Sequence, residues 1–279
     1  MYFVVALGFA LFAVSAAFAA DAANLGLRPI PKDLAALPPP DSDSNVYNPN
    51  LNWGVGILEP TASPEYYGQL VNGGYEMLRE EFGEYLDWIA KLRLPLFDSA
   101  QGAQWGWLVE GQVVDLDSGE EFVIPRDARL RVSYDFETEA LFVMREEDGW
   151  LQIRWGGAED SHGGRAWTHP EFQSDPNIGA EYHSWEDSFR DTVSRLSYRN
   201  SEAVHLLRSR PSPEAAIVHR IEGRDWDMEI LEMQGDWIRV RLSWPSDCSA
   251  GPREGEAVGW TVWRSVDQGP WIYSPIGGC

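Results

Sequence analysis

Two short segments of this chain share a pattern that restricts what it can fold into. Asp148 to Trp155 reads DGWLQIRW, and Gly235 to Leu242 reads GDWIRVRL. In each, a tryptophan is followed by apolar and polar residues in strict alternation. Because side chains alternate faces along a β-strand, each segment predicts a strand with its tryptophan, Trp150 or Trp237, on the polar face.

Similar short runs, rich in Val, Ile, Trp and Tyr, surround both segments. Turn sequences such as DSG, PRD and EDG separate them, which is typical of antiparallel strands joined by tight turns. We therefore predict a mainly β protein with two β-rich regions. The runs are WGWLVEG, EEFVIP, RLRVSYDF, ALFVMRE and GWLQIRW after Pro95, and AVHLLRS, AAIVHRI, MEILEM, WIRVRL, VGWTVWR and PWIYS after Ser201.

The two regions are weakly repetitive. ALFVMREEDGW, a loop and GRAW in the first region match MEILEMQGDW, a longer loop and VGWTVW in the second. Both resemble the bacterial SH3-like (SH3b) family, in which an apolar strand, a Gly/Asp turn, W-x-x-(I/V) and a later G-W mark a five-stranded barrel. LLRSRPSPEAAIVHRI also resembles the family's opening R-x-x-P-S segment. The resemblance covers residues 94–170 and 203–275 and implies two small barrels that serve as secreted or cell-envelope binding modules, with no catalytic residues to carry over.

The N-terminal part of the chain differs in composition from these regions. Residues 1–20 form an uncharged apolar run with a small-x-small ending, which predicts a cleaved signal peptide, with a retained membrane anchor as the alternative. Residues 21–60 are rich in Pro, Asp and Ser and predict an extended linker, mobile over residues 22–52. Residues 61–92 carry an apolar stripe at helical spacing and predict a helical segment, with a hairpin turning at Gly83 as the alternative.

The rest of the chain divides into three parts. We predict the first barrel over residues 93–170 and the second barrel, with a C-terminal tail, over residues 201–279. Residues 171–200 are polar and mixed, and predict a connector with a short helix around Trp185 to Leu196.

Charge and motifs limit the function. The formal net charge of -22 argues against nucleic acid or an anionic membrane surface as a partner. We expect a protein or a cell-wall component as partner, no integral membrane association after signal cleavage, and a periplasmic or extracellular location. The histidines, including His162 and His169, match no established metal-ligand spacing, so neither a metal nor another cofactor is predicted.

The sequence carries no G-x-S-x-G elbow, no H-E-x-x-H and no phosphate-cradling glycine loop. We therefore predict a secreted, non-enzymatic binding or interaction protein of the bacterial cell envelope. Two alternatives stay open: a structural interaction protein without a free groove, and a hydrolase of cell wall or polysaccharide that uses unassigned carboxylates among the 44 acidic residues.

The 14 tryptophans suggest where ligands bind, because exposed indoles stack on sugars and peptides. Apolar neighbours or inward alternation favour core or barrel-edge packing for Trp155, Trp167 and Trp260. It places Trp150 and Trp237 beside arginines on an outward face, which is either a ligand platform or covered by another segment: the loop 243–258, the helix after residue 63 or the tail 271–279. The predicted ligand-binding residues are Tyr134, Trp150, Arg154, Trp226, Trp237, Arg239 and Trp263.

The chain has two cysteines, Cys248 and Cys279, both near its C-terminal end. An even count in an exported chain favours a disulfide, which would stabilise the fold by about 3–4 kcal/mol through restriction of the unfolded chain. We predict this bridge, which would hold the C-terminal tail against the loop after WIRVRL.

Overall fold

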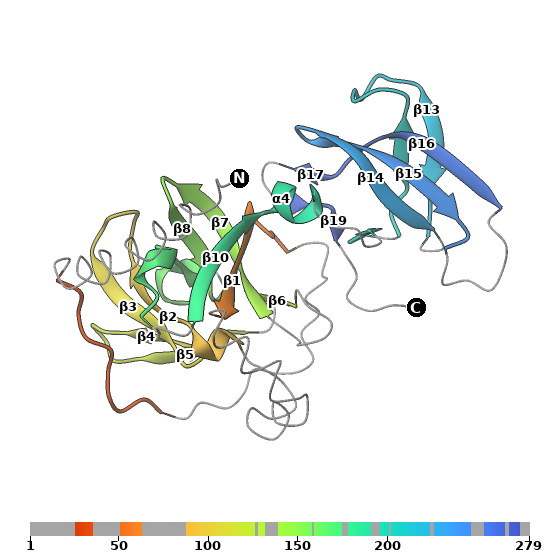
Figure 1. Cartoon of the computed structure of the whole chain (residues 1–279). Helices are drawn as coiled ribbons and strands as arrows, with labels where there is room; N and C mark the ends of the chain where they lie inside the picture. The colour runs from red at the N-terminus through yellow and green to blue at the C-terminus, as the bar shows by residue number, and fades with distance from the viewer. Residues whose placement is uncertain are drawn as a thin grey trace, which may run out of the picture.

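The computed structural model of the chain describes residues 26–35, 51–62, 88–125, 128–131, 139–157, 159–174, 178–190, 196–200, 202–223, 226–246, 254–265 and 268–273. Antiparallel sheets dominate these residues, which confirms the predicted mainly β class. Figure 1 shows the strands in two lobes, which we call the first and the second unit. The predicted signal peptide, Tyr134 and both cysteines of the predicted disulfide lie outside the described residues.

The first unit is built on one sheet with the strand order β10-β1-β7-β8-β9-β2-β3-β4-β5, and β6 pairs with β7 beside this path. Every pairing in it is antiparallel. The strands are β1 (Gly56–Ala62), β2 (Arg93–Phe97), β3 (Gln104–Val109), β4 (Gln112–Asp115), β5 (Glu121–Val123), β6 (Arg129–Arg131), β7 (Glu139–Glu147), β8 (Trp150–Arg154), β9 (Arg165–Thr168) and β10 (Ile178–Ser184).

The second unit has a five-stranded sheet with the order β13-β12-β16-β15-β14. Two short strand pairs, β11 with β19 and β17 with β18, accompany it. Its strands are β11 (Ser197–Tyr198), β12 (His205–Arg208), β13 (Ile217–Ile221), β14 (Asp227–Gln234), β15 (Trp237–Trp244), β16 (Gly255–Val262), β17 (Arg264–Ser265), β18 (Gly269–Pro270) and β19 (Ile272–Tyr273).

Five strands of the first unit follow the same path as the five-stranded sheet of the second. The order β3-β2-β9-β8-β7 in one matches β13-β12-β16-β15-β14 in the other. The irregularities match as well. The pairing of β7 with β8 skips one residue, Met144, and the pairing of β14 with β15 skips one residue, Leu231. The first strand of each hairpin, β2 or β12, shifts register at its last residue, Phe97 or Arg208.

The register fixes which positions correspond in the two units. Trp167 pairs with Gln152 across β8 and β9, and Trp260 pairs with Arg239 across β15 and β16. Each position on one outward face therefore has a counterpart on the other. The corresponding pairs are Trp150 and Trp237, Gln152 and Arg239, Trp167 and Trp260, His169 and Val262, and Phe97 and Arg208.

The alternation predicted for β8 and β15 is confirmed. In both segments the apolar residues after the tryptophan face a hydrophobic core, and none is more than 1% exposed. They are Leu151, Ile153 and Trp155 in the first unit, and Ile238, Val240 and Leu242 in the second.

Residues 26–35, which we call the strap, correct the linker prediction for that stretch. Ile30 and Leu34 pack on Trp107 and its apolar neighbours in β3 and β4. The Trp107 indole Nε1 donates a hydrogen bond to the Arg28 carbonyl oxygen at 3.0 Å. The strap is therefore part of the first unit, where Figure 1 shows it in red at the edge of the lobe.

The described ends of the predicted helical segment 61–92 are not α-helical. β1 extends to Ala62 and pairs with β10 and β7, and Trp88–Lys91 forms a short 3-10 helix, η1. Residues 63–87 lie outside the described ranges. The edge strand β10 and its neighbour β1 thus come from the predicted connector, linker and helical segment.

The connector contains the short helix that the sequence predicts, α4 (Trp185–Arg190), which Figure 1 shows between the two lobes. Trp185 and Trp53 pack together with ring centroids 5.5 Å apart, and the Trp185 Nε1 donates to the Trp53 carbonyl oxygen at 3.2 Å. Trp53 also contacts Phe142 of β7 and Tyr273 of β19. One hydrophobic core therefore continues from the first unit into the second.

None of the helices in the described part of the chain is both long and apolar enough to cross a membrane.

Candidate binding site

A groove of about 380 Å³ opens on the outward face of the second unit. It lies where β12, the start of β15 and the end of β16 meet Trp271 and the loop after β12. The lining residues are Val204, His205, Leu206, Arg208, Pro213, Trp237, Thr261, Val262 and Trp271.

The apolar walls of the groove follow from the strand register. Trp237 and Val262 are directly opposite each other on β15 and β16, so their side chains share the outward face. Val262 is 37% exposed and Val204 is 49% exposed, so both present apolar surface to the groove. Trp271 lines the other side and is fixed by its backbone N–H, which donates to the Trp263 carbonyl oxygen at 2.6 Å.

The polar groups at the floor of the groove already have partners. The hydroxyls of Thr261 and Tyr198 share a hydrogen bond of 2.6 Å. The His205 ring stacks on Tyr198 with centroids 3.5 Å apart, and its Nε2 lies 2.9 Å from the Asn200 carbonyl oxygen. Burial lowers the pKa of His205, so the ring is neutral at pH 7. The floor is therefore uncharged, and its polar groups are hydrogen-bonded within the protein.

Arg208 is the one charged residue among those that line the groove at neutral pH. Its Nη1 donates to the Ala215 carbonyl oxygen at 2.8 Å, which holds the loop that carries Pro213 against β12. The groove is thus mainly apolar, with a single cation at its border. Such a site suits an extended peptide that inserts apolar side chains.

The corresponding face of the first unit is covered. Trp150 is only 9% exposed and belongs to a small cluster with Phe97 and Trp167. Leu27 of the strap and Phe172 of the 3-10 helix η4 (Pro170–Phe172) pack on this cluster. The rings of Phe97 and Phe172 lie 5.1 and 5.6 Å from the Trp150 ring, both edge-on. The structure therefore does not place Trp150 at an open ligand site.

Two other predicted site residues, Trp226 and Trp263, belong to the hydrophobic core. Trp226 is 7% exposed, and its Nε1 donates to the Gly223 carbonyl oxygen at 3.0 Å. Trp263 has no exposed surface, and its Nε1 donates to the Gly235 carbonyl oxygen at 2.8 Å. Their burial places neither side chain at an open surface, so the structure does not support the prediction that they contact a ligand.

The arginines that the sequence places beside the outward tryptophans, Arg154 and Arg239, have other partners. Arg154 lies over the Phe142 ring at 4.6 Å and donates to the Asn52 carbonyl oxygen at 2.8 Å. Arg239 is exposed, and its guanidinium lies 3.9 Å from the Glu232 carboxylate. Of the predicted ligand-binding residues within the described ranges, only Trp237 lines the groove.

Sequence reasoning missed most of the groove. Val262 could have been found, because alternation from Trp260 places it on the outward face. Trp271 was expected only as part of a covering tail, and it does lie beside Trp237 as a groove wall. Val204 and Pro213 come from loops whose positions depend on the whole fold, so no local pattern identifies them.

Within the described ranges, no group of three or more His, Cys, Asp or Glu side chains is placed to hold a metal ion. No protein-family model matches this chain, and the comparison with curated proteins finds no match either.

Proposed function

We propose that this protein is a non-enzymatic binding protein of the bacterial cell envelope, built from two SH3-like units, and that the second unit binds an extended peptide segment of a partner protein. The observation that carries the proposal is the apolar groove around Trp237, which is open on a face that the first unit covers with its own chain.

The matching strand order and register support the relation between the two units. Two unrelated sheets would have no reason to place a bulge at Met144 and at Leu231, at the same spacing before the outward tryptophan. A hairpin followed by a three-stranded meander also agrees with the SH3-like motifs in the sequence, the Gly/Asp turn with W-x-x-(I/V) and the later G-W.

The chemistry of the occupant is argued from the first unit. There, an extended segment with the sequence GLRPIPKDLA lies against the sheet and seats Leu27 on the cluster that contains Trp150. The corresponding site at Trp237 offers an apolar surface of the same kind. A segment with apolar side chains and prolines therefore fits the groove, and a formal net charge of -22 disfavours a strongly acidic partner.

The proposed location rests on the N-terminal sequence. Residues 1–20 are apolar and end in Ala-Phe-Ala-Ala, which is typical of an exported precursor. Two cysteines in the C-terminal region agree with an oxidising compartment, where the proposed Cys248–Cys279 bridge could form.

The groove can be tested with a defined probe, a synthetic peptide with the strap sequence GLRPIPKDLA, together with a library of proline-containing peptides. We expect the protein to bind members of this set in a calorimetric or NMR titration. Val262→Asp, which puts a carboxylate on the apolar wall, should weaken binding at least about tenfold, or 1.4 kcal/mol.

Val258→Asp is the matched control. Val258 lies on the same strand and the same outward face, is 36% exposed against 37% for Val262, and does not line the groove. Its substitution should leave peptide binding unchanged. Failure of every peptide to bind, or equal losses in the two variants, would show that the groove is not a peptide site. A gain of affinity on removal of residues 274–279 would instead identify the chain's own tail as the occupant.

A further inference from the structure

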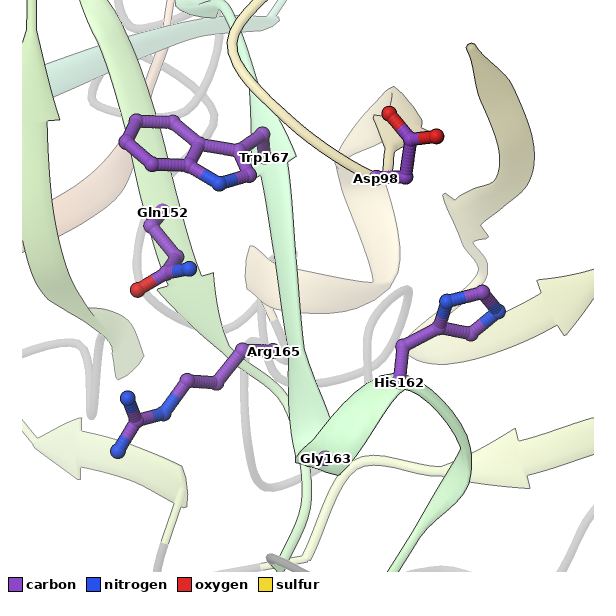
Figure 2. Close-up of a pocket in the computed structure, with 6 residues that line it drawn as sticks. All are labelled: Asp98, Gln152, His162, Gly163, Arg165 and Trp167. Carbon is purple, nitrogen blue, oxygen red and sulfur yellow. The ribbon is translucent and has the colours of Figure 1, made fainter. Parts of the chain in front are cut away.

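A second, separate cleft lies on the outward face of the first unit, next to the covered cluster around Trp150. Its volume is about 340 Å³. Figure 2 shows Gln152, Arg165 and Trp167 on one side of it and Asp98 and His162 on the other. The lining residues are Asp98, Gln152, His162, Gly163, Arg165 and Trp167, so the cleft is polar where the groove of the second unit is apolar.

Several polar atoms at this cleft have no partner in the described part of the protein. The Gln152 Oε1 is buried and accepts no hydrogen bond. The Trp167 Nε1 makes no hydrogen bond with the described residues, and Figure 2 shows it on the side of the ring that faces Gln152. Asp98 uses Oδ1 to accept from the Ala103 N–H and the Ser99 hydroxyl, which leaves Oδ2 for another donor. A ligand could therefore make several hydrogen bonds here without breaking any.

The lining combines donors with acceptors. The Trp167 indole and the Arg165 guanidinium donate, the Asp98 carboxylate accepts, and the Gln152 amide does both. This combination suits hydroxyl groups, since each hydroxyl is itself a donor and an acceptor. The permanent charges of Arg165 and Asp98 cancel, so the cleft has no excess charge with which to select a phosphate or a cation.

His162 gives the cleft a flat ring at its border. The imidazole stacks on the Trp105 ring with centroids 3.8 Å apart and an interplanar angle of 15°. A tight turn holds it there, because His162 and the next two glycines, Gly163 and Gly164, all have positive φ angles. At Gly164 a side chain would also collide with the Gly156 backbone. A fixed ring with one face free is the kind of surface on which the C–H groups of a sugar pack.

We propose that the first unit binds a neutral sugar unit of a glycan in this cleft. Asp98, Gln152, Arg165 and the Trp167 indole would hydrogen-bond the hydroxyl or acetamido groups, and His162 would pack against the ring. The protein then carries two different sites on corresponding faces, one for peptide and one for sugar.

The test is a calorimetric titration of the full chain with two neutral trisaccharides, cellotriose and triacetylchitotriose, and with an acidic one, a trigalacturonate. We expect at least one neutral sugar to bind. Gln152→Leu keeps the size of the side chain but removes its polar atoms, and it should weaken binding at least about tenfold. His162→Ala, at an exposed position, removes the ring and should weaken binding as well.

Arg239→Leu is the matched control, because Arg239 corresponds to Gln152 but lies in the second unit. It should leave sugar affinity unchanged, as should Val262→Asp in the peptide groove. The proposal is overturned if neither neutral sugar binds up to about 10 mM, if only the acidic sugar binds, or if binding survives both Gln152→Leu and His162→Ala. Because the two sites share no residue, these results are independent of the peptide experiment.

Discussion

Trp150 and Trp237 occupy corresponding positions on corresponding strands, yet Trp150 is 9% exposed and Trp237 lines an open groove. The strands themselves do not account for this difference. In the first unit, Leu27 from the strap and Phe172 from η4 cover the tryptophan. Strand alternation thus decides which way a side chain points, and segments outside the strand decide whether it meets solvent.

A single position shows how the two faces have diverged. Phe97 ends β2 and packs on Trp150, whereas the corresponding residue at the end of β12 is Arg208. An aromatic side chain extends the apolar cluster and provides a seat for the strap. An arginine at the same place borders an open groove and holds the neighbouring loop through Ala215.

The largest effect should come from truncating the two tryptophans in turn. Trp150→Ala removes a side chain that is packed on several sides and should lower the free energy of unfolding by about 3–5 kcal/mol, the usual cost for a buried aromatic. Trp237→Ala removes a half-buried ring and should cost about 1–2 kcal/mol. Urea denaturation followed by circular dichroism measures both.

The test depends on Trp150→Ala costing more unfolding free energy than Trp237→Ala, and less on either value. Equal losses would mean that Trp237 is as well covered in solution as Trp150, and the open groove would then be filled by another part of the chain. Trp155→Ala is a useful reference, since Trp155 is 1% exposed and lies in the core of the first unit.

The next effect concerns the strap. Leu27→Ala combined with Ile30→Ala shortens two apolar side chains that pack on the first unit, and it should lower the free energy of unfolding by about 2 kcal/mol. Loss of the cover should also let an apolar dye bind at Trp150. Dye fluorescence and urea denaturation together test this, with Lys32→Ala as a substitution in the same segment that should change neither. Rapid proteolysis of residues 26–35 in the native protein would contradict the packed strap.

The strap shows where prediction from sequence fails. Its prolines and charges are typical of a linker, and its contacts are distant in the chain: the Trp107 Nε1 and the Arg28 carbonyl oxygen are 79 positions apart. No local periodicity reports such a contact. The strands β7 and β8, by contrast, are predicted because alternation and two-residue turns are local, as at Asp148 and Gly149, where both φ angles are positive.

The groove shows the same contrast between features that a local pattern predicts and features that depend on distant parts of the chain. Alternation correctly directs Trp237 outward, and applied to β16 it would also have separated Trp260 from Trp263, because the two differ by three positions. Trp260, for which core or barrel-edge packing is predicted, pairs with Arg239 on the outward face and is half-buried. Trp263 was predicted to bind a ligand and is fully buried. The walls formed by Val204, Pro213 and Trp271 depend on loop positions that only the fold determines.

The smallest expected effect is a change in the free energy of unfolding with pH, which depends on one histidine in each unit. His169 packs on Trp150 and Phe172 in the first unit, and burial lowers its pKa from the ordinary value of 6.5, partly opposed by Glu171. His205 stacks on Tyr198 beneath the groove of the second unit, and burial lowers its pKa as well, partly opposed by its hydrogen bond to the Asn200 carbonyl oxygen.

A lowered histidine pKa makes the folded protein bind fewer protons than the unfolded chain at pH values just below 6.5. The free energy of unfolding should therefore fall as the pH drops from 7.5 to 5.5 and recover when the pH is raised again. Urea denaturation at pH 7.5, 6.5 and 5.5 measures the slope. His169→Gln and His205→Gln each replace a titrating ring with a neutral amide, so each should reduce the slope. The larger reduction identifies the unit in which burial lowers the histidine pKa further. A slope that neither variant changes would show that both rings titrate as they do in the unfolded chain, and Trp150 would then be less well covered than its 9% exposure indicates.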